Sequence, residues 1–326
     1  MAYASDGRKP HLTPILWEID VISVSQSLPS KLLVVGGDSL IGRGLVKYFQ
    51  RQGVTVHYTS RRPNDGLPDC IPLELGKAIA LPNIPDVAIL CAGVTDFRTC
   101  AEQPDATRRI NVDAVLELAA TLHLGGSRIL YLSSNAVREI EHHNIQSEVL
   151  LPITTEYGAQ KFDAERGILA LGDRATVVRA TKVVSCKVPL FADWLTRLGK
   201  QVEIQPFSEK SFCPISLRFI IKCLAELVPR NVSGVFHLSG VGLVSYTEFA
   251  LQLAASMNAD YKLVVPTSIY DVGIPRVGHP QHPCLDMKST TAILGSTAQS
   301  VESVINDLLE EFAMEHALAR IEKLDC

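Results

Sequence analysis

The sequence has no long hydrophobic run, no marked excess of charge of one sign and no closely paired cysteines. No apolar stretch in its 326 residues approaches the roughly 18 residues that would suggest a membrane-spanning helix. Lysine and arginine number 31 and aspartate and glutamate 35, so the net charge of −4 does not favour nucleic acid or a membrane as a partner. The eight cysteines form no Cys-x-x-Cys pair, which predicts reduced thiols in a cytoplasmic protein.

The sequence predicts neither a targeting segment nor a metal site. The first residues lack the basic-then-apolar pattern of a secretory signal, and Asp6, Glu18 and Asp20 argue against a transit peptide. The stretch 279–284 holds two histidines and a cysteine, but the prolines between them favour a plain loop over a zinc site. We therefore expect no targeting segment and no metal.

Short apolar strands alternate with amphipathic helices over the first half of the chain. Strands are expected at 31–35, 54–58, 86–93, 128–132 and 175–180, and helices at 40–52, 104–123 and 156–170. Helices of this length between strands are typical crossovers between parallel strands. The predicted fold class is therefore α/β, a Rossmann-type doubly wound parallel sheet.

The pattern changes after about residue 185. A smaller lobe is expected there, with helices at 216–227 and 245–257, a strand at 234–239, a loop over 264–287 and a terminal amphipathic helix at 299–321. The predicted organisation is an N-terminal arm over 1–29, a dinucleotide-binding domain over 30–185 and a C-terminal substrate lobe over 186–326, with segments that return to the main sheet.

A glycine-rich turn follows the first predicted strand, and a helical pattern follows the turn. The unpaired N–H groups and the dipole of a helix N-terminus favour phosphate, so this context indicates a dinucleotide site over a plain turn. Ser39 occupies a position where glycine is commoner. The predicted phosphate-binding residues are Gly36, Gly37, Ser39, Leu40, Ile41 and Gly42.

Two arginines end the second predicted strand. Arg61 lies 25 positions after Gly36, near the place where dinucleotide folds contact the ribose. An acidic residue there would accept a hydrogen bond from a 2′-hydroxyl, whereas a guanidinium can donate to a 2′-phosphate. Arg61 and Arg62 therefore favour NADP as the cofactor, with NAD as the alternative. The plainer interpretation is that both arginines are solvated before a proline turn.

A tyrosine and a lysine are spaced for one face of a helix. Tyr157 and Lys161 are four residues apart, and Ser134 ends a predicted strand 23 residues before Tyr157. An ammonium close to a phenol lowers the pKa of the phenol, which can then pass a proton to a carbonyl oxygen. A serine hydroxyl at the carboxyl end of a strand can bind the same oxygen. The three residues predict carbonyl reduction or its reverse.

In this order, the motifs resemble the extended short-chain dehydrogenase/reductase superfamily over roughly residues 31–325. The resemblance includes Ala92 and Gly93 after a strand and Asn111 on the following helix. It implies a catalytic set of Ser134, Tyr157 and Lys161. It further implies that the cofactor is contacted by Ala92, Gly93, Asn111 and Lys161, the last through the nicotinamide ribose.

Within this superfamily, the stretches 92–102 and 280–288 look like the dTDP-4-dehydrorhamnose reductase branch. The second stretch stands where those reductases carry a substrate-side motif, although an arginine of that motif is missing at Pro280. Arg138 stands where the family often has an aromatic residue. Asn135 and Ala136 after Ser134 do not supply the extra acid and base of a 4,6-dehydratase, which argues against that activity.

The resulting prediction is an NADP(H)-dependent reductase of a ketone on a nucleotide-linked sugar. Tyr157 would deliver the proton, Lys161 would lower the pKa of Tyr157, and Ser134 would steady the oxyanion. Two alternatives stay open, an epimerase that retains NAD and a non-catalytic NADP-binding regulatory subunit. The expected partner is a small-molecule nucleotide-sugar, with a homodimer as the assembly to be tested.

Overall fold

A computed structural model describes residues 27–62, 69–77, 83–137, 155–269 and 284–324, with side chains described up to residue 318. The predicted arm over 1–29 therefore lies almost wholly outside the described residues. The same holds for Arg138 and for residues 280–283 of the predicted substrate-side motif.

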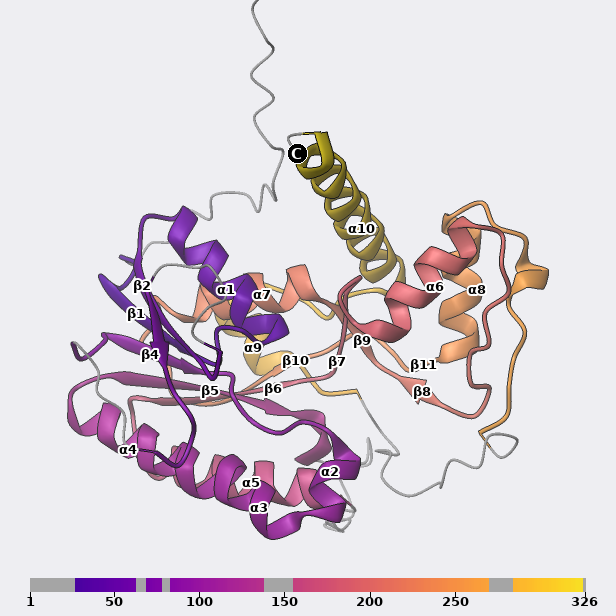
Figure 1. The fold of residues 1–326 in the computed structure, drawn as a ribbon. Helices are drawn as coiled ribbons and strands as arrows, with labels where there is room; N and C mark the ends of the chain where they lie inside the picture. Colours follow the sequence, from indigo (N-terminus) through magenta and orange to yellow (C-terminus); the bar gives the residue numbers. More distant parts are fainter. Residues whose placement is uncertain (1–26, 63–68, 78–82, 138–154, 270–283, 325–326) are drawn as a thin grey trace, which may run out of the picture.

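Seven parallel strands form the main sheet, in the order β10-β6-β5-β4-β1-β2-β3 (Figure 1). The strands are β1 (Lys31–Val35), β2 (Thr55–Ser60), β3 (Cys70–Pro72), β4 (Val87–Leu90), β5 (Arg128–Ser134), β6 (Ala175–Ala180) and β10 (Gly234–Leu238). β1 lies next to the central strand β4, and the later strands add outward from this pair in both directions, which confirms the predicted doubly wound α/β class. In such sheets, ligands bind at the carboxyl ends of the strands where the winding reverses, here between β1 and β4.

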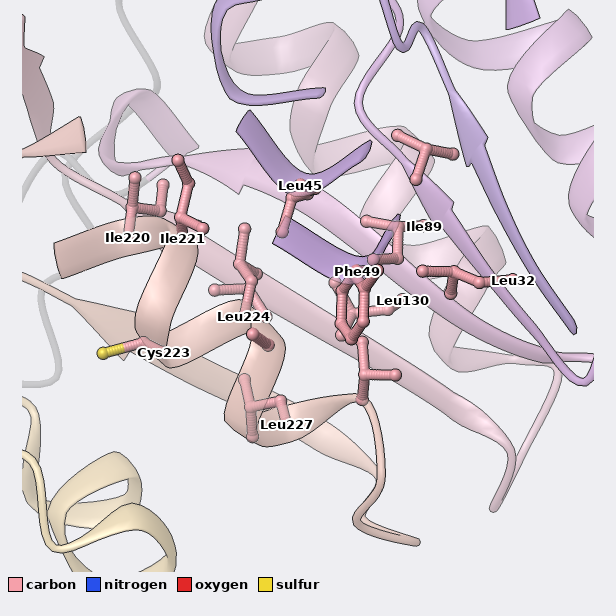
Figure 2. Packing of buried hydrophobic residues seen from close by; sticks show 14 of the residues in the cluster. Leu32, Leu45, Phe49, Ile89, Leu130, Ile220, Ile221, Cys223, Leu224 and Leu227 are labelled. Carbon is pink, nitrogen blue, oxygen red and sulfur yellow. The ribbon is translucent and has the colours of Figure 1, made fainter. Parts of the chain in front are cut away.

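Helices cover both faces of this sheet because each strand buries both of its faces. On one face lie α1 (Leu40–Arg51) and α7 (Leu217–Leu227), and on the other lie α4 (Val115–Leu124) and α5 (Glu156–Leu169) (Figure 1). Leu32 and Val34 of β1 pack on the α1 side, whereas Leu33 and Val35 pack on the α4 side. Figure 2 shows the first of these cores, where α1 and α7 meet over the sheet.

A second hydrophobic core lies beside the sheet and is built from C-terminal elements. Phe191, Trp194, Phe212 and Phe249 are buried together there. Its elements are α6 (Pro189–Gly199), β8 (Ser211–Phe212), β11 (Val244–Ser245), α8 (Tyr246–Ser256) and the start of α10 (Val301–Leu324). Trp194 is thus a packing residue of this core. Meanwhile α7, β10 and α9 (Lys288–Leu294) return to the main sheet.

One predicted helix is interrupted. The stretch expected to be a single helix over 104–123 consists of α3 (Pro104–Arg108), a π-helical turn (Arg109–Ala114) and α4. A π turn inserts an extra residue into the helix and is frequent at functional sites. Here the turn carries Asn111, whose side chain is buried. The remaining short elements are α2 (Phe97–Glu102), β7 (Lys182–Val184), β9 (Pro214–Ser216) and 3₁₀ turns at Asn135–Val137 and Tyr261–Leu263.

Candidate active site

The glycines of the turn between β1 and α1 stand at positions that have no room for a side chain. Gly36 has a φ of +81°, and a Cβ atom there would lie 2.9 Å from Ala92, which follows β4. A Cβ atom on Gly42 would lie 2.2 Å from the carbonyl oxygen of Gly36, and one on Gly37 would lie 2.5 Å from Tyr58. Both distances are shorter than any van der Waals contact. The turn is therefore pressed against its own helix, against β2 and against the residues after β4.

Ser39 caps the helix that follows this turn. Its Oγ accepts a hydrogen bond from the backbone N–H of Gly42 at 3.1 Å, and its backbone has the extended conformation of a helix N-cap. The N–H groups of Leu40 and Ile41 occupy the first helical positions, where the helix itself offers no acceptor. The serine at this unusual position thus holds the end of α1 and leaves two backbone donors for an anion.

The arginines after β2 lie beside the same turn. Both are exposed, and Nη2 of Arg62 lies 3.4 Å from Oδ2 of Asp38. The Arg62 side chain is 76% exposed, so this ion pair contributes little to stability. The backbone N–H of Arg62 donates to Oγ of Ser60 at 2.9 Å, which orients the end of the strand. The structure therefore places Arg62 beside the glycine turn, and its contact with a 2′-phosphate stays a prediction.

A cavity of about 340 Å³ opens beside the turn, between α1 and α10. Ser39, Arg43 and Lys47 line it from the α1 side, and Glu315 lines it from α10. Burial and the positive charge of Lys187 lower the pKa of Lys47. The lining carries charge of both signs, since Asp38 and Glu315 lie there with the basic side chains, and Lys187 pairs with Glu315 at 2.7 Å.

The carboxyl end of β5 brings Ser134 to Tyr157. Tyr157 lies in the first turn of α5, behind the N-cap residue Thr155, and its hydroxyl hydrogen-bonds the Ser134 side chain. The tyrosine is only 7% exposed, and the ring of Phe97 from α2 lies 5.0 Å from its own ring, centre to centre. Burial raises the pKa of Tyr157, and the hydrogen bond from Ser134 offsets only part of that rise. The phenol therefore holds its proton firmly.

Lys161 lies one helical turn beyond Tyr157 and is also buried. Its Nζ donates a hydrogen bond to the carbonyl oxygen of Leu132 at 3.0 Å and lies 4.5 Å from the centre of the Tyr131 ring. Burial lowers the pKa of Lys161 to about 8, although the Cys91 and Glu165 side chains raise it in part. The expected lowering of the Tyr157 pKa by Lys161 is therefore wrong in this structure. Burial shifts both groups toward their neutral forms, and the Lys161 ammonium is held by Leu132.

The Asn111 side chain links the segment after β4 to α5 through hydrogen bonds. Its Oδ1 accepts from the N–H of Val94 at 2.7 Å, and its Nδ2 donates to the carbonyl of Val94 at 2.9 Å and to Oε1 of Gln160 at 2.8 Å. A Cβ atom on Gly93 would lie 2.9 Å from Oδ1 of Asn111. These bonds occupy the amide and tie the segment after β4 to α5. Asn111 thus positions Ala92 and Gly93, and the cofactor contact implied by the resemblance stays a prediction.

Gln160 is a site residue that the sequence analysis missed. It is fully buried, and its Nε2 donates to Thr107 Oγ1 at 2.9 Å and to Glu156 Oε1 at 2.9 Å. Together with its bond to Asn111, these contacts fix the helix that carries Tyr157 and Lys161. The available signal was a polar side chain on the apolar face of α5, three residues after the tyrosine.

Two further features concern the residues that the structure describes. No group of three His, Cys, Asp or Glu side chains is placed to bind a metal ion there. In the same residues, no helix is both long enough and apolar enough to span a membrane.

The family model described as RmlD substrate binding domain matches residues 30–314. A curated relative from Haloferax volcanii, "Probable low-salt glycan biosynthesis reductase Agl14", is 23% identical over 86% of this chain and 97% of its own length. Another, methionine adenosyltransferase 2 subunit beta of Xenopus laevis, is 25% identical over 82% of this chain and 84% of its own. The crystal structure of dTDP-4-dehydrorhamnose reductase from Bacillus anthracis in complex with NADP matches the fold with a TM-score of 0.70 and 18% identity, over 88% of this chain and 100% of that one.

Proposed function

The chain belongs to the RmlD substrate binding domain family, and on that basis we propose that it is an NADP(H)-dependent reductase of a ketone on a nucleotide-linked sugar. The observation that carries the proposal is the hydrogen bond between Tyr157 and Ser134 at the carboxyl end of β5. Two hydroxyl groups that meet there can bind the same carbonyl oxygen. The names of the Haloferax and Bacillus relatives, both reductases, support the same reaction class.

The turn between β1 and α1 fits a dinucleotide. Close packing around Gly36 and Gly42 lets a pyrophosphate approach the backbone, and the N–H groups of Leu40 and Ile41 are donors for it. Arg62 would bind the 2′-phosphate of NADP in place of its present partner, Asp38. Bound NADPH would supply the hydride that the reaction needs.

Tyr157 would act as the proton donor. A phenol with a raised pKa keeps its proton until a strong base forms next to it. The carbonyl oxygen becomes such a base when its carbon accepts hydride, so proton transfer and carbonyl reduction are coupled. Ser134 would donate a second hydrogen bond to the same oxygen and stabilise its developing charge. Lys161 would bind the ribose hydroxyls with the ammonium that now binds Leu132.

Substitution of Tyr157 by phenylalanine tests the proposal. We expect Tyr157→Phe to lower kcat by about 10²- to 10⁴-fold, because it removes the proton donor, while NADPH affinity stays nearly constant. The assay follows NADPH oxidation with a panel of nucleotide-linked 4-ketosugars. A matched control is Tyr246→Phe, which removes a phenol hydroxyl from the second core, where the ring stacks on Phe212 at 4.3 Å. Unchanged turnover in Tyr157→Phe would contradict the assignment.

A second candidate function is a non-catalytic NADP-binding subunit. The match to methionine adenosyltransferase 2 subunit beta favours it, since that relative is named as a subunit. The depth at which Tyr157 is buried beneath Phe97 is compatible with this role. The two functions predict different results for one variant. If Tyr157→Phe retains the biological output together with NADPH binding, the subunit function is the correct one.

The epimerase alternative is tested by the cofactor that copurifies. An epimerase returns the hydride to its product and therefore keeps NAD(H) bound between turnovers. Absorbance at 340 nm and mass spectrometry of the denatured, freshly purified protein would identify such a cofactor. Stoichiometric NAD(H) would favour the epimerase, whereas a protein that binds added NADPH reversibly and releases NADP is a reductase.

A further inference from the structure

The cavity between α1 and α10 has a volume of about 340 Å³ and is lined largely by apolar side chains. Leu217 and Ile221 of α7 belong to the lining and are each only 5% exposed, and Met314 and Leu318 line it from α10. Gly44 of α1 leaves room for Ile221, since a Cβ atom on Gly44 would lie 2.2 Å from Cδ1 of Ile221. This site, the α1–α10 cavity, therefore suits an apolar segment.

The acidic side chains that line the α1–α10 cavity already have partners in the structure. Oδ2 of Asp38 lies 3.4 Å from Nη2 of Arg62, and Oε1 of Glu315 lies 2.7 Å from Nζ of Lys187. Glu311 is buried and accepts two hydrogen bonds from the segment that follows β7. The negative charge of the lining is therefore compensated by groups of the protein itself.

The basic residues of α1 form a stripe along the cavity. Arg43, Lys47 and Arg51 are spaced four residues apart, which places them on one side of the helix, and all three belong to the lining. Lys47 and Arg51 are exposed, so their charges are accessible to a carboxylate that arrives from outside. The cavity therefore favours an apolar segment that carries negative charge.

The chain enters the main sheet next to this cavity. Leu28 packs on the hydrophobic core that α1 shares with α7, and so does Tyr48, which also lines the cavity. Lys31 at the start of β1 pairs with Thr55, only four residues after Arg51. The residues before Lys31 therefore approach the end of α1 on the face of the sheet that carries the cavity.

A segment of matching composition lies shortly before this entry. Residues 15–22, Ile-Leu-Trp-Glu-Ile-Asp-Val-Ile, lie outside the described residues; their sequence holds six apolar residues, the acids Glu18 and Asp20, and no basic residue. An extended chain would place both acids on one side and the apolar residues at positions 15, 17, 19 and 21 on the other. The sequence of this segment is therefore complementary to the α1–α10 cavity in both polarity and charge.

The segment is close enough to reach the cavity and long enough to follow it. Ile22 comes five residues before residue 27, the first described residue, and five extended residues span up to about 17 Å. The 12 residues of α1 make a helix about 18 Å long, whereas eight extended residues span about 26 Å. Residues 15–22 can therefore run beside α1 from Arg51 to Arg43.

We propose that residues 15–22 bind in the α1–α10 cavity of the same chain. Their apolar side lies against α7 and α10, and Glu18 and Asp20 pair with Lys47 and Arg51 of α1. The opposite charges set the position of the segment, and burial of its apolar side chains supplies most of the binding free energy.

The bound segment would contact the helix that begins at the glycine turn. Ser39 and Leu40, at the N-terminus of α1, line the same cavity. The bound segment would therefore lie against the helix whose first turn belongs to the proposed dinucleotide site. The inference does not depend on the proposed reductase activity, because its detection needs neither NADPH nor a sugar.

The two tryptophans of the chain provide the test, because only one of them lies in this segment. Trp194 is buried in the second core, so Trp194→Phe leaves Trp17 as the single tryptophan of the full-length protein. We expect acrylamide to quench Trp17 at least about threefold less efficiently than in a free peptide of residues 10–26, because the cavity excludes solvent from the indole ring. Equal quenching in protein and peptide would overturn the proposal. If Trp194→Phe does not fold, the difference between the wild type and Trp17→Phe gives the same quantity.

Reversal of the charge on α1 assigns the protection to this cavity. In the single-tryptophan protein, Lys47→Glu with Arg51→Glu should raise the quenching to the level of the free peptide. The matched control is Arg197→Glu with Lys200→Glu at the end of α6, which changes two exposed residues and the net charge by the same amount and should leave the tryptophan protected. Protection that survives the reversal on α1 would contradict the assignment.

A charge swap distinguishes lost pairing from a damaged fold. Glu18→Lys with Asp20→Lys, added to the reversed cavity, should restore at least about half of the protection, since the attraction returns with opposite signs. A swap that restores nothing would overturn the pairing of these acids with α1.

Dilution separates binding within one chain from binding between two copies. Protection by the same chain should stay constant over about a hundredfold range of protein concentration, because the segment is tethered to its cavity. A loss of protection on dilution would show that the segment of a second copy occupies the cavity, and the proposal for the same chain would then be wrong.

Discussion

The turn over Gly36–Gly42 and the cluster around Tyr157 lie at the same edge of the sheet, yet different forces shape them. At the turn, contacts between backbone atoms decide the geometry, and the charged groups beside it are exposed. Around Tyr157 and Lys161, the side chains are buried, and burial decides their protonation. One part of the site therefore depends on close packing and the other on desolvation. Changes of different kinds should therefore break each part.

The largest effect is expected from Gly42→Ala at the turn. The added Cβ would lie 2.2 Å from the carbonyl oxygen of Gly36, so the turn or the helix must move. We expect a loss of about 3 kcal/mol or more in the free energy of unfolding, together with loss of NADPH binding. Chemical denaturation and fluorescence titration measure the two effects. The control is Gly242→Ala, where a Cβ meets nothing within 4 Å; equal effects of both variants would refute the packing argument.

Asn111→Ala should give the next largest effect, because it leaves the Val94 N–H and Oε1 of Gln160 without their partner and removes one of two donors to the Val94 carbonyl oxygen. We expect a loss of about 2–3 kcal/mol in the free energy of unfolding. Asn231→Ala, at an exposed asparagine, should be nearly neutral. If Asn111→Ala instead weakens NADPH binding at unchanged stability, Asn111 binds the cofactor and does not mainly hold Val94 and Gln160 in place.

The pH dependence of stability should reveal the buried charge on Lys161. The folded pKa of about 8 lies below the unfolded value of 10.5, so the unfolded chain binds more protons between these values and stability rises with pH there. Lys161→Met removes this contribution. Between pH 8 and 10, the wild type should therefore gain about 2 kcal/mol relative to Lys161→Met.

Urea denaturation of both proteins at several pH values measures this difference. The other titrating groups are common to both proteins and cancel in the comparison. A difference that does not change with pH would show that Lys161 keeps an ordinary pKa, and desolvation would then not decide the protonation of this cluster.

The smallest effect is expected at the exposed rim of the turn. Arg62→Ala should weaken NADPH binding about tenfold and leave NADH binding unchanged, because only NADPH carries the 2′-phosphate. The stability should hardly change, since the ion pair with Asp38 is solvated. Arg197→Ala, an exposed arginine on α6, is the control and should alter neither affinity. Equal losses for NADPH and NADH in Arg62→Ala would rule out the phosphate contact.

Much of the sheet could be predicted because its strands are local patterns. The apolar runs before Gly36, Ala92 and Ser134 became β1, β4 and β5 in the expected parallel arrangement. The elements missed were short or lay in the second lobe, such as β8, β11 and α6, whose apolar residues pack against distant parts of the chain. Their partners are separated by many residues in the sequence, so no local period indicates them.

The sequence by itself determined the order of the elements, the glycine turn before α1, the position of Ser134 at the end of β5 and the positions of Tyr157 and Lys161 in the first two turns of α5. These features depend on near neighbours in the chain and on the geometry of strands and helices. Only the tertiary structure decided that the Asn111 side chain hydrogen-bonds Gln160 and that Lys161 binds the carbonyl oxygen of Leu132. Burial and long-range contact set hydrogen bonds and pKa values, and both arise only when distant segments pack together.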